Sequence, residues 1–340
     1  MARIEENISL KHFNTFGIDA RAKYFAEVSS IEDLQKLIKE PVYKNNKHLI
    51  LGGGSNILFT KDFDGLVIRS SLKGIRVLNN DGDTALVEAA SGENWHSLVM
   101  YCIQNNYGGI ENLSLIPGTT GAAPIQNIGA YGVEIKDVIT KVEGIDLITA
   151  TKLSFSNADC QFNYRESVFK HNLKEKIFIS SITLKLTKAE HQLHTQYGAI
   201  QDILKQQNIE HPTIKNISDA VIAIRQSKLP DPLVIGNAGS FFKNPTIALT
   251  EYELIKKDHP SIPSYPVDNQ NVKVPAGWLI EQCGWKGKRI GNIGVHPHQA
   301  LVLVNYGDGN GNEIYKLAMN IQSSVKEKFG ITLSTEVNII

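Results

Sequence analysis

The sequence is poor in the residues that support several classes of protein. It has three cysteines in 340 residues, Cys102, Cys160 and Cys283, and no C-x-x-C pair. This spacing supports neither a disulfide scaffold nor a zinc knuckle, so we expect three reduced, packed thiols. His296 and His298 could lie on one side of an extended segment, but no third metal ligand stands near them. We therefore expect no metal site.

Long apolar runs and net charge are also absent. No stretch approaches the roughly 18 apolar residues of a membrane helix, and the N-terminal "MARIEENISLKHFNTFG" lacks the apolar core of a signal peptide. Lys plus Arg and Asp plus Glu each total 35, so the formal net charge is zero. The chain therefore has no excess of positive charge of the kind that indicates binding to DNA or RNA. We expect a cytoplasmic monomer with small-molecule partners, and neither a nucleic-acid nor a membrane partner.

Hydrophobic periodicity predicts a protein that mixes helices and strands. The chain is longer than one hydrophobic core usually allows. The pattern of predicted elements changes in the last third of the sequence. Together these features indicate an α+β protein with a domain boundary near residues 205–218. In the final strand, Glu336 falls on the phase opposite to Val337 and Ile339. Helices are predicted within 29–40, 93–109, 217–232, 275–284 and 312–330, and strands within 48–56, 65–70, 84–92, 137–148, 176–187, 300–306 and 331–340.

Two stretches are rich in glycine. The glycine turn, GGGSN at 52–56, follows a predicted strand, and the glycine loop, IPGTTGAAPIQNIGAYG at 116–132, has almost no large side chain. Ile57 stands where a Rossmann fingerprint needs glycine, and no GK[ST] of a P-loop follows. One such stretch is most often an ordinary turn. Two in one domain fit a dinucleotide such as FAD, because glycine-rich backbone presents N–H groups to a pyrophosphate.

The glycine loop is long for a connection inside a domain. Loops of this length are usually functional or disordered. Ile116, Ile125 and Ile128 supply apolar side chains, so we expect this one to be ordered.

A third stretch, the serine segment GNAGSFFKNP at 236–245, holds one serine beside two phenylalanines. It is not a nucleophile elbow, because G-x-S-x-G needs glycine where Ala238 and Phe242 stand. On these residues alone, Ser240 is most simply a residue of a tight turn.

Eight motifs occur in one order: NTFGI (14–18), LGGGSN (51–56), the glycine loop, NYRES (163–167), IRQSKLPDP (224–232), the serine segment, AGWLIEQCG (276–284) and STEV (334–337). Together they resemble the UDP-N-acetylenolpyruvoylglucosamine reductase family, from about residue 14 to the C-terminus. The resemblance implies the FAD-binding fold of the vanillyl-alcohol oxidase and p-cresol methylhydroxylase type, plus a C-terminal α+β substrate-binding domain. The expected parts are FAD-binding subdomains at 1–70 and 71–205 (FAD-binding region about 17–189), and a substrate-binding domain at 206–340 whose last strand holds Glu336.

The resemblance also implies a reaction. Members reduce UDP-N-acetylglucosamine enolpyruvate to UDP-N-acetylmuramate in peptidoglycan precursor synthesis. NADPH gives hydride to non-covalent FAD, hydride then reaches substrate C3, and a proton is added at C2. Ser240 resembles the proton donor, since a hydroxyl can protonate a very basic carbanion. Arg165 resembles the group that stabilises the enolate, and Glu336, an acid that could anchor this region if it keeps its proton, resembles the third catalytic residue. Without the resemblance, these would be a turn serine, a surface arginine and a solvated acid.

The same pattern assigns binding residues. Arg225 and Lys228 stand three apart on a predicted helix and share a face, and Tyr197 resembles a mobile tyrosine that closes over the uridine diphosphate, with an ordinary loop anchor as the alternative. Ala122 and Ala123 replace the hydroxyl residues of many relatives, so main-chain N–H groups must do more for the FAD phosphates. The expected substrate residues are Tyr164, Tyr197, Arg225, Lys228, Asn244 and Gln299. The expected FAD residues are Gly52, Gly53, Gly54, Ser55, Asn56, Gly118, Thr119, Gly121, Ile125, Asn127, Gly129 and Ala130.

Two alternative functions stay open. A flavin oxidase of the same fold would use the glycine stretches, but it has no place for the serine segment or for Glu336. A non-catalytic UDP-sugar binder would be expected to lack Ser240, Arg165 or Glu336, and all three are present.

Overall fold

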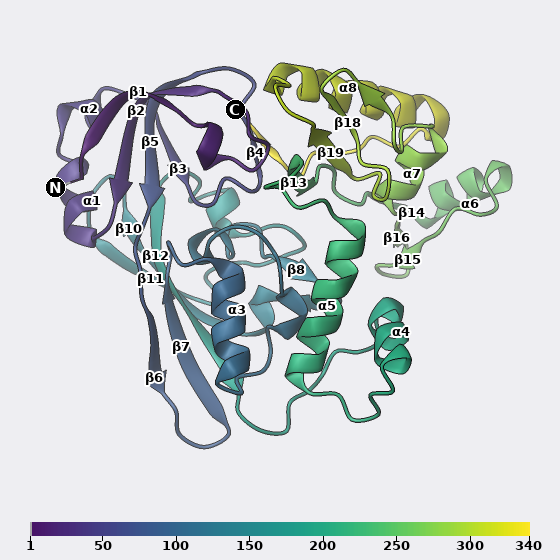
Figure 1. Cartoon of the computed structure of the whole chain (residues 1–340), viewed down its shortest axis with the longest axis horizontal. Helices are drawn as coiled ribbons and strands as arrows, with labels where there is room; N and C mark the ends of the chain where they lie inside the picture. The colour runs from purple at the N-terminus through teal and green to yellow at the C-terminus, as the bar shows by residue number, and fades with distance from the viewer. Residues whose placement is uncertain (1) are drawn as a thin grey trace. The chain divides into compact units, whose positions relative to one another are not determined.

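The computed structural model describes residues 2–340, which divide into two compact units (Figure 1). Unit 1 comprises the chain up to Ile8 together with Ala22–Gly53 and Phe63–Ser227. Unit 2 comprises Ser9–Arg21, Gly54–Asp62 and Lys228–Ile340. The chain therefore passes from one unit to the other within the glycine turn.

The first part of unit 1 is a four-stranded sheet with two helices. The strand order is β1-β2-β5-β3, and β5 runs parallel to both β2 and β3. Helix α1 begins after Ser30, whose side chain accepts a hydrogen bond from Asp33 N, as an N-cap does. The elements are β1 (Ile4–Ser9), β2 (Arg21–Val28), α1 (Ile31–Leu37), α2 (Pro41–Lys44), β3 (His48–Leu51) and β5 (Phe63–Ser70).

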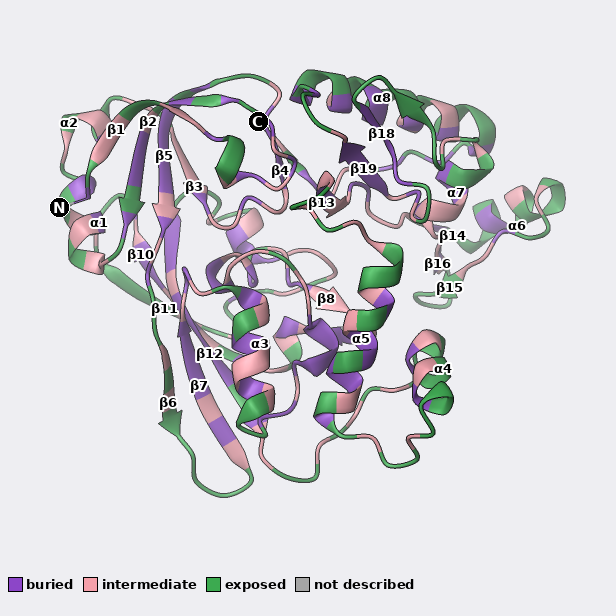
Figure 2. Cartoon of the chain, viewed as in Figure 1, coloured by how far each residue is buried: buried purple, intermediate pink, exposed green. Residues whose placement is uncertain are grey.

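The second part of unit 1 is a five-stranded antiparallel sheet of order β11-β10-β12-β7-β6. One face is apolar because Val87, Ala89, Ile182 and Leu184 alternate with polar residues. Helix α3 packs on that face, as the buried residues of Figure 2 show. The strands are β6 (Ile75–Asn79), β7 (Thr84–Ala90), β10 (Ile139–Asp146), β11 (Lys152–Ser156) and β12 (Ile177–Thr187), and a small hairpin joins β8 (Gly129–Ala130) and β9 (Val133–Glu134).

Three helices complete unit 1. Helix α3 lies within the range 93–109 predicted for a helix, and it buries Trp95, Leu98, Val99 and Cys102. Helices α4 and α5 share a separate apolar cluster that includes Ile200 and Val221. The helices are α3 (Trp95–Gln104), α4 (Gly198–Gln206) and α5 (Ile214–Lys228), the last of which ends at the unit boundary.

Unit 2 contains two small antiparallel sheets and a parallel pair. The sheets have the orders β13-β19-β18-β17 and β14-β16-β15, and β20 runs parallel to β4. The strands are β4 (Ile57–Leu58), β13 (Gly236–Ser240), β14 (Thr246–Ala248), β15 (Tyr265–Pro266), β16 (Asn271–Lys273), β17 (Arg289–Ile290), β18 (Ile293–Val295), β19 (Val302–Asn305) and β20 (Asn338–Ile339). The helices are α6 (Leu249–Asp258), α7 (Ala276–Gln282) and α8 (Gly311–Phe329).

Helix α8 follows its prediction closely. Its apolar stripe from Ile314 to Val325 is buried. Asn310 and Glu313 form a capping box at its start, and Gly330 takes a left-handed conformation at its end, with φ of 74°. The helix predicted within 312–330 is therefore confirmed.

Two local predictions are wrong. The last strand is limited to Asn338–Ile339, so Glu336 precedes it. Leu333 and Val337 are still buried, because their segment packs on the core of unit 2 without forming a long ladder. Helix α3 ends before Gly108, and Asn106, with φ of 58°, takes the left-handed position instead. In the glycine loop, Ile128 is buried, whereas Ile125 is 37% exposed.

The three cysteines are free thiols, as expected from their spacing. Cys102 and Cys160 are buried free thiols, and burial raises the pKa of each to about 12. Neither is therefore a reactive thiolate near neutral pH. Over residues 2–340, no helix combines the length and apolar content that crossing a membrane requires.

Candidate active site

The glycine turn and the glycine loop meet in unit 1. A Cβ added at Gly53 would lie 2.8 Å from the Cα of Gly118, and one added at Gly52 would lie 2.7 Å from Thr119 Oγ1. Only glycine allows main chain to approach main chain so closely. The two stretches predicted to hold one cofactor are therefore in direct contact.

This contact region contains main-chain N–H groups that are available as hydrogen-bond donors. Gly118 O accepts from Trp95 N at 3.1 Å, whereas within unit 1 no hydrogen bond is recorded for the N–H groups of Gly53, Gly118 and Thr119. Adjacent unpaired N–H groups bind anions, including phosphate. No hydroxyl side chain stands at Ala122 or Ala123, so the main chain must provide such donors. These residues fit the pyrophosphate of a dinucleotide.

The rest of the glycine loop is held by side chains. Asn127 is fully buried, and its amide donates to Glu134 Oε2 at 2.9 Å and to Asn163 O at 3.0 Å. Its Oδ1 accepts from Lys136 N at 3.1 Å. The Asn127 side chain is thus engaged within unit 1. Gly121 N donates to Ser91 O at 3.0 Å, so its N–H group also has a protein partner.

Arg165 lies against the end of the glycine loop. Its Nη2 donates to Gly129 O at 2.6 Å and its Nη1 to Asn127 O at 3.4 Å. Its guanidinium stands 5.3 Å from the ring centroid of Tyr164. Arg165 has φ of 56°, a left-handed conformation that is uncommon outside glycine. The structure thus brings Arg165, Tyr164 and Gly129 together.

Tyr197 and Arg225 form a second cluster in unit 1, together with Tyr131. The rings of Tyr131 and Tyr197 meet edge to face at a centroid distance of 5.2 Å. Arg225 Nε donates to Leu115 O at 3.3 Å. The positive charge of Arg225 opposes the rise in the pKa of Tyr131 that burial causes. Tyr197 is 52% exposed, so it remains accessible to a ligand although its ring packs against Tyr131.

Ser240 ends β13 in unit 2. Gly239 before it has φ of 68°, and the pairing of β13 with β19 is irregular between Asn237 and Ser240. The extra residue of this bulge lies between Asn237 and Ser240, and Ser240 itself pairs with Val302 of β19. The serine is half-buried, and within unit 2 no hydrogen bond of its hydroxyl is recorded. Phe241 and Phe242 after it are buried, so the hydroxyl is fixed next to a rigid core.

The NTFGI motif explains why residue 236 in unit 2 is a glycine. A Cβ at Gly236 would lie 2.3 Å from Phe16 O, and Asn237 N donates to Thr15 O at 2.9 Å. Thr15 N in turn donates to Gly54 O at 3.0 Å. The motif therefore connects the serine segment with the second half of the glycine turn.

Glu336 belongs to the same region of unit 2. Its N–H donates to Phe241 O at 2.8 Å, and its carbonyl accepts from Asn56 Nδ2 at 3.2 Å. Main-chain bonds thus connect Glu336 to the residue after Ser240. The glutamate side chain is half-buried.

The remaining predicted substrate residues lie in unit 2. Asn244 Oδ1 accepts from Ala276 N at 2.9 Å, at the start of α7. Gln299 Oε1 accepts from Leu301 N at 3.3 Å, before β19. Lys228 is exposed at the end of α5. Each amide keeps its NH2 group available, and Lys228 offers a mobile cation.

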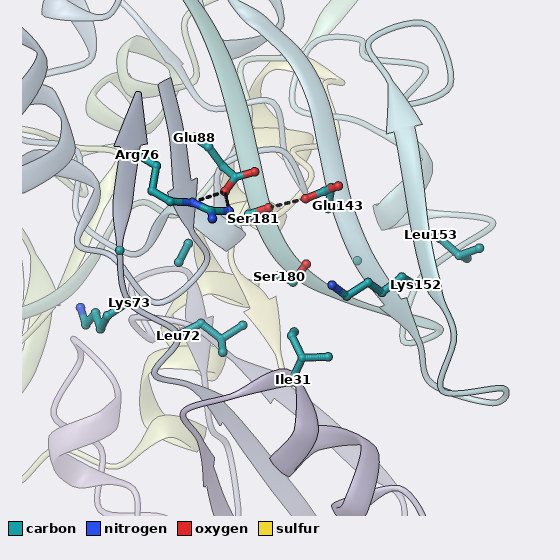
Figure 3. Close-up of a pocket in the computed structure, with 13 residues that line it drawn as sticks. Ile31, Leu72, Lys73, Arg76, Glu88, Glu143, Lys152, Leu153, Ser180 and Ser181 are labelled. Carbon is teal, nitrogen blue, oxygen red and sulfur yellow. Dashed lines mark hydrogen bonds and ion pairs between the residues drawn. The ribbon is translucent and has the colours of Figure 1, made fainter. Parts of the chain in front are cut away.

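A separate hollow lies on the polar face of the five-stranded sheet (Figure 3). Its volume is about 340 Å3. Arg76 Nε donates to Glu88 at 3.1 Å, and Ser181 Oγ donates to Glu143 at 3.2 Å, so these charged groups satisfy one another. It is lined by none of the predicted site residues.

Sequence reasoning missed three residues beside the glycine loop. Asn112 is fully buried and donates to Tyr131 O at 3.1 Å and to His194 O at 2.9 Å. It therefore connects the glycine loop with the segment before Tyr197. His96 and Tyr131 are the others. Tyr131 belongs to one of the eight motifs, but no sequence signal marks Asn112 or His96, because their side chains bond to main-chain groups distant in the sequence.

Two family models match the chain. Residues 22–151 match a family described as FAD binding domain, and residues 231–340 match UDP-N-acetylenolpyruvoylglucosamine reductase, C-terminal domain. The second match covers the part of the chain in which a flavin oxidase would have a different domain. A relative from Flavobacterium johnsoniae, named UDP-N-acetylenolpyruvoylglucosamine reductase, is 52% identical over 337 residues, or 99% of each chain.

Two solved structures share the fold. The crystal structure of UDP-N-acetylenolpyruvylglucosamine reductase (MurB) from Thermus caldophilus has a TM-score of 0.71 at 21% identity, and the match covers 100% of this chain and 99% of that one. 6-Hydroxy-D-nicotine oxidase from Arthrobacter nicotinovorans has a TM-score of 0.51 at 11% identity, with 98% and 87% covered. The α+β architecture and the FAD-binding fold shared with oxidases are thereby confirmed.

Proposed function

The chain belongs to the UDP-N-acetylenolpyruvoylglucosamine reductase family, and on that premise we propose which of its residues perform the reaction. It reduces UDP-N-acetylglucosamine enolpyruvate to UDP-N-acetylmuramate in peptidoglycan precursor synthesis, with FAD as cofactor and NADPH as reductant. The observation that supports our assignment most is the contact between Gly53 and Gly118, because it joins the two stretches with unpaired main-chain donors.

The glycine turn and the glycine loop hold the cofactor. When bound, FAD supplies the hydride that NADPH provides and the substrate receives. The N–H groups of Gly53, Gly118 and Thr119 donate to its pyrophosphate, because they have no partner in unit 1. Asn127 and Gly121 contribute by shaping the loop, since their side-chain and main-chain groups are bonded internally. The other assigned residues are Gly52, Gly54, Ser55, Asn56, Ile125, Gly129 and Ala130.

Ser240 donates the proton to C2 of the substrate. Hydride addition at C3 leaves negative charge at C2, conjugated with the carboxylate, and this carbon is basic enough to take a proton from a hydroxyl. Two observations favour Ser240 for this step. Its hydroxyl has no hydrogen bond within unit 2, and two buried phenylalanines fix its position.

Arg165 and Glu336 act on the developing negative charge. The planar guanidinium of Arg165 presents several donors to a carboxylate or enolate, and its bond to Gly129 O fixes its orientation. Glu336 holds the same region of the substrate through its carboxyl group. Its main-chain bond to Phe241 O keeps it beside the serine segment.

Six further residues bind the substrate. Arg225 and Lys228 meet the negative charges of the diphosphate or carboxylate, and Tyr197 covers the uridine diphosphate. The exposure of Tyr197 and its edge-to-face contact with Tyr131 support a side chain that can exchange partners. Asn244 and Gln299 add polar contacts through their side-chain NH2 groups, and Tyr164 adds a contact through its hydroxyl group.

We also propose the wider setting of the enzyme. The FAD-binding subdomains span residues 1–70 and 71–205, and the substrate-binding domain spans residues 206–340, of which residues 206–227 belong to unit 1 of the structure. The protein acts as a cytoplasmic monomer. Size-exclusion chromatography with light scattering would test the monomer, with a mass near 37.6 kDa expected.

The direct test of the proposed function is an absorption experiment on the purified protein. A flavin band should be bleached anaerobically by NADPH and restored by UDP-N-acetylglucosamine enolpyruvate. Recovery only with oxygen would contradict the assignment of the substrate residues. A protein with no flavin band after incubation with FAD would contradict the assignment of both glycine stretches.

A further inference from the structure

We propose that His96 is a positioning residue for the cofactor, because it holds the main chain at the point where the glycine loop begins. His96 lies on α3, and its Nδ1 accepts a hydrogen bond from Leu115 N at 3.0 Å. On the other side of the same residue, Leu115 O accepts from Arg225 Nε at 3.3 Å. Side chains of two helices therefore fix both polar groups of Leu115. This inference rests on the assignment of residues 116–132 to FAD.

The conformation of Leu115 explains why it needs such support. Its φ is 59°, in the left-handed region that residues with a Cβ disfavour. Such a conformation persists only where the surroundings over-determine it. Three residues later, Gly118 contacts Gly53 and offers an unpaired N–H group. A change of backbone at Leu115 would therefore move the donors that we assign to the pyrophosphate.

The hydrogen bond requires neutral His96. A main-chain N–H can only donate, so the Nδ1 that faces it must be unprotonated. The charged group placed against His96 is Arg225 of α5, which in turn is near Tyr131. On the α3 side, Glu93 is engaged by Lys73 and Gly74 N. Burial and the charge of Arg225 lower the pKa of His96, and both favour the neutral form.

A pH dependence follows from this geometry. Above the ordinary histidine pKa of about 6.5, His96 is neutral whether or not the loop is ordered, and FAD binds with full affinity. As the pH falls below that value, protonation of His96 competes with the ordered loop. The dissociation constant for FAD therefore rises toward acid pH and levels off below the lowered pKa.

The experiment measures the FAD dissociation constant of the full-length apoprotein by flavin fluorescence, from about pH 5 to pH 8. Three variants are compared with the unaltered protein. His96→Asn places an amide oxygen where Nδ1 stands and keeps an acceptor that does not titrate. His96→Leu removes the acceptor. His211→Asn is the matched control at an exposed histidine in unit 1.

The expected results separate these variants. His96→Leu should raise the dissociation constant about three- to tenfold at pH 8, the range of one lost hydrogen bond. His96→Asn should bind FAD as the unaltered protein does at pH 8, with a flat pH profile. The unaltered protein and His211→Asn should both weaken several-fold toward pH 5. If His96→Leu does not fold, the proposal is still tested by the pH profiles of the FAD dissociation constant in the unaltered protein and in His96→Asn.

Two results would overturn the proposal. Equal affinities and pH profiles in all four proteins would show that His96 does not position the loop. An equal loss in His96→Asn and His96→Leu would show that the acceptor is not what matters. Failure of all four proteins to bind FAD would instead contradict the proposed function.

Discussion

The glycine loop in unit 1 and the serine segment in unit 2 are both short of large polar side chains, yet they are held in different ways. The glycine loop depends on side chains that bond to main-chain groups, among them Asn127, Arg165 and Asn112. The serine segment forms a main-chain ladder with β19 and is followed by two buried phenylalanines.

This difference separates two tasks. A loop fixed by individual hydrogen bonds can be loosened bond by bond without unfolding a core, which suits a segment that must admit a cofactor. A segment built into a sheet and an aromatic core holds a reacting hydroxyl within the narrow limits that proton transfer needs. Changes in the loop should therefore alter cofactor binding, and changes in the serine segment should alter chemistry or stability.

A large effect is expected for Arg165→Lys, which keeps the charge but removes the planar set of donors. Substrate reduction should fall about 10²–10³-fold, the usual cost of losing an oxyanion donor. Stopped-flow reoxidation of the reduced enzyme by substrate would measure it. Arg76→Lys, in the Arg76–Glu88 pair of the polar sheet face, is the matched control and should change the rate less than twofold. A rate for Arg165→Lys within threefold of the unaltered enzyme would contradict the role.

Gly53→Ala should break the contact between the glycine turn and the glycine loop. The added Cβ would lie 2.8 Å from Gly118 Cα, and overpacking of this kind costs about 1–3 kcal/mol. The dissociation constant for FAD should rise about tenfold or more. Gly198→Ala is the control, because nothing lies within 4 Å of its added Cβ. Unchanged FAD affinity in Gly53→Ala would show that the contact does not shape the site.

Asn112→Ala should show how much one buried amide contributes to the ordering of the loops. Its removal leaves Tyr131 O and His194 O without this donor, at a cost of about 1–3 kcal/mol in the free energy of unfolding. Urea unfolding would measure the loss. The exposed Asn105, which bonds within its own helix end, provides the control, and Asn105→Ala should cost less than about 0.5 kcal/mol. Equal losses in the two variants would remove the special role of Asn112.

The smallest effect is expected for Gly239→Ala in the serine segment. No atom lies within 4 Å of the added Cβ, so the cost is that of the left-handed φ of 68° alone, about 1 kcal/mol. Urea unfolding should detect this loss while FAD affinity stays unchanged. A tenfold weaker FAD affinity would contradict the division of tasks between the two stretches.

Much of the fold could be predicted because its signals are local. The stripe and caps of α8 occupy consecutive turns of one helix, and the strands at 137–148 and 176–187 alternate clearly. The final strand could not be predicted correctly, because Leu333 and Val337 alternate in the same way whether or not the segment pairs. Alternation reports burial on one side, and pairing depends on a partner far away in the chain.

The residues of the candidate site also differ in whether a local sequence signal marks them. Glycines can be recognised in the sequence because no other residue allows the approach of Gly53 to Gly118. Asn112 and His96 could not be found, since their roles depend on the main chain of residues 19 to 82 positions away. The left-handed conformation of Arg165 likewise has no signal in NYRES. Side chains that support a loop become visible only once the fold is known.

The central claim is that the glycine stretches serve the cofactor and Ser240 serves the substrate. Its most direct test is a comparison of the two half-reactions in Ser240→Ala by anaerobic stopped-flow absorption. Bleaching of the flavin band by NADPH should keep its normal rate, whereas its recovery with UDP-N-acetylglucosamine enolpyruvate should slow by about 10²–10⁴-fold, the contribution of a general acid. Equal slowing of both half-reactions, or of neither, would contradict the account.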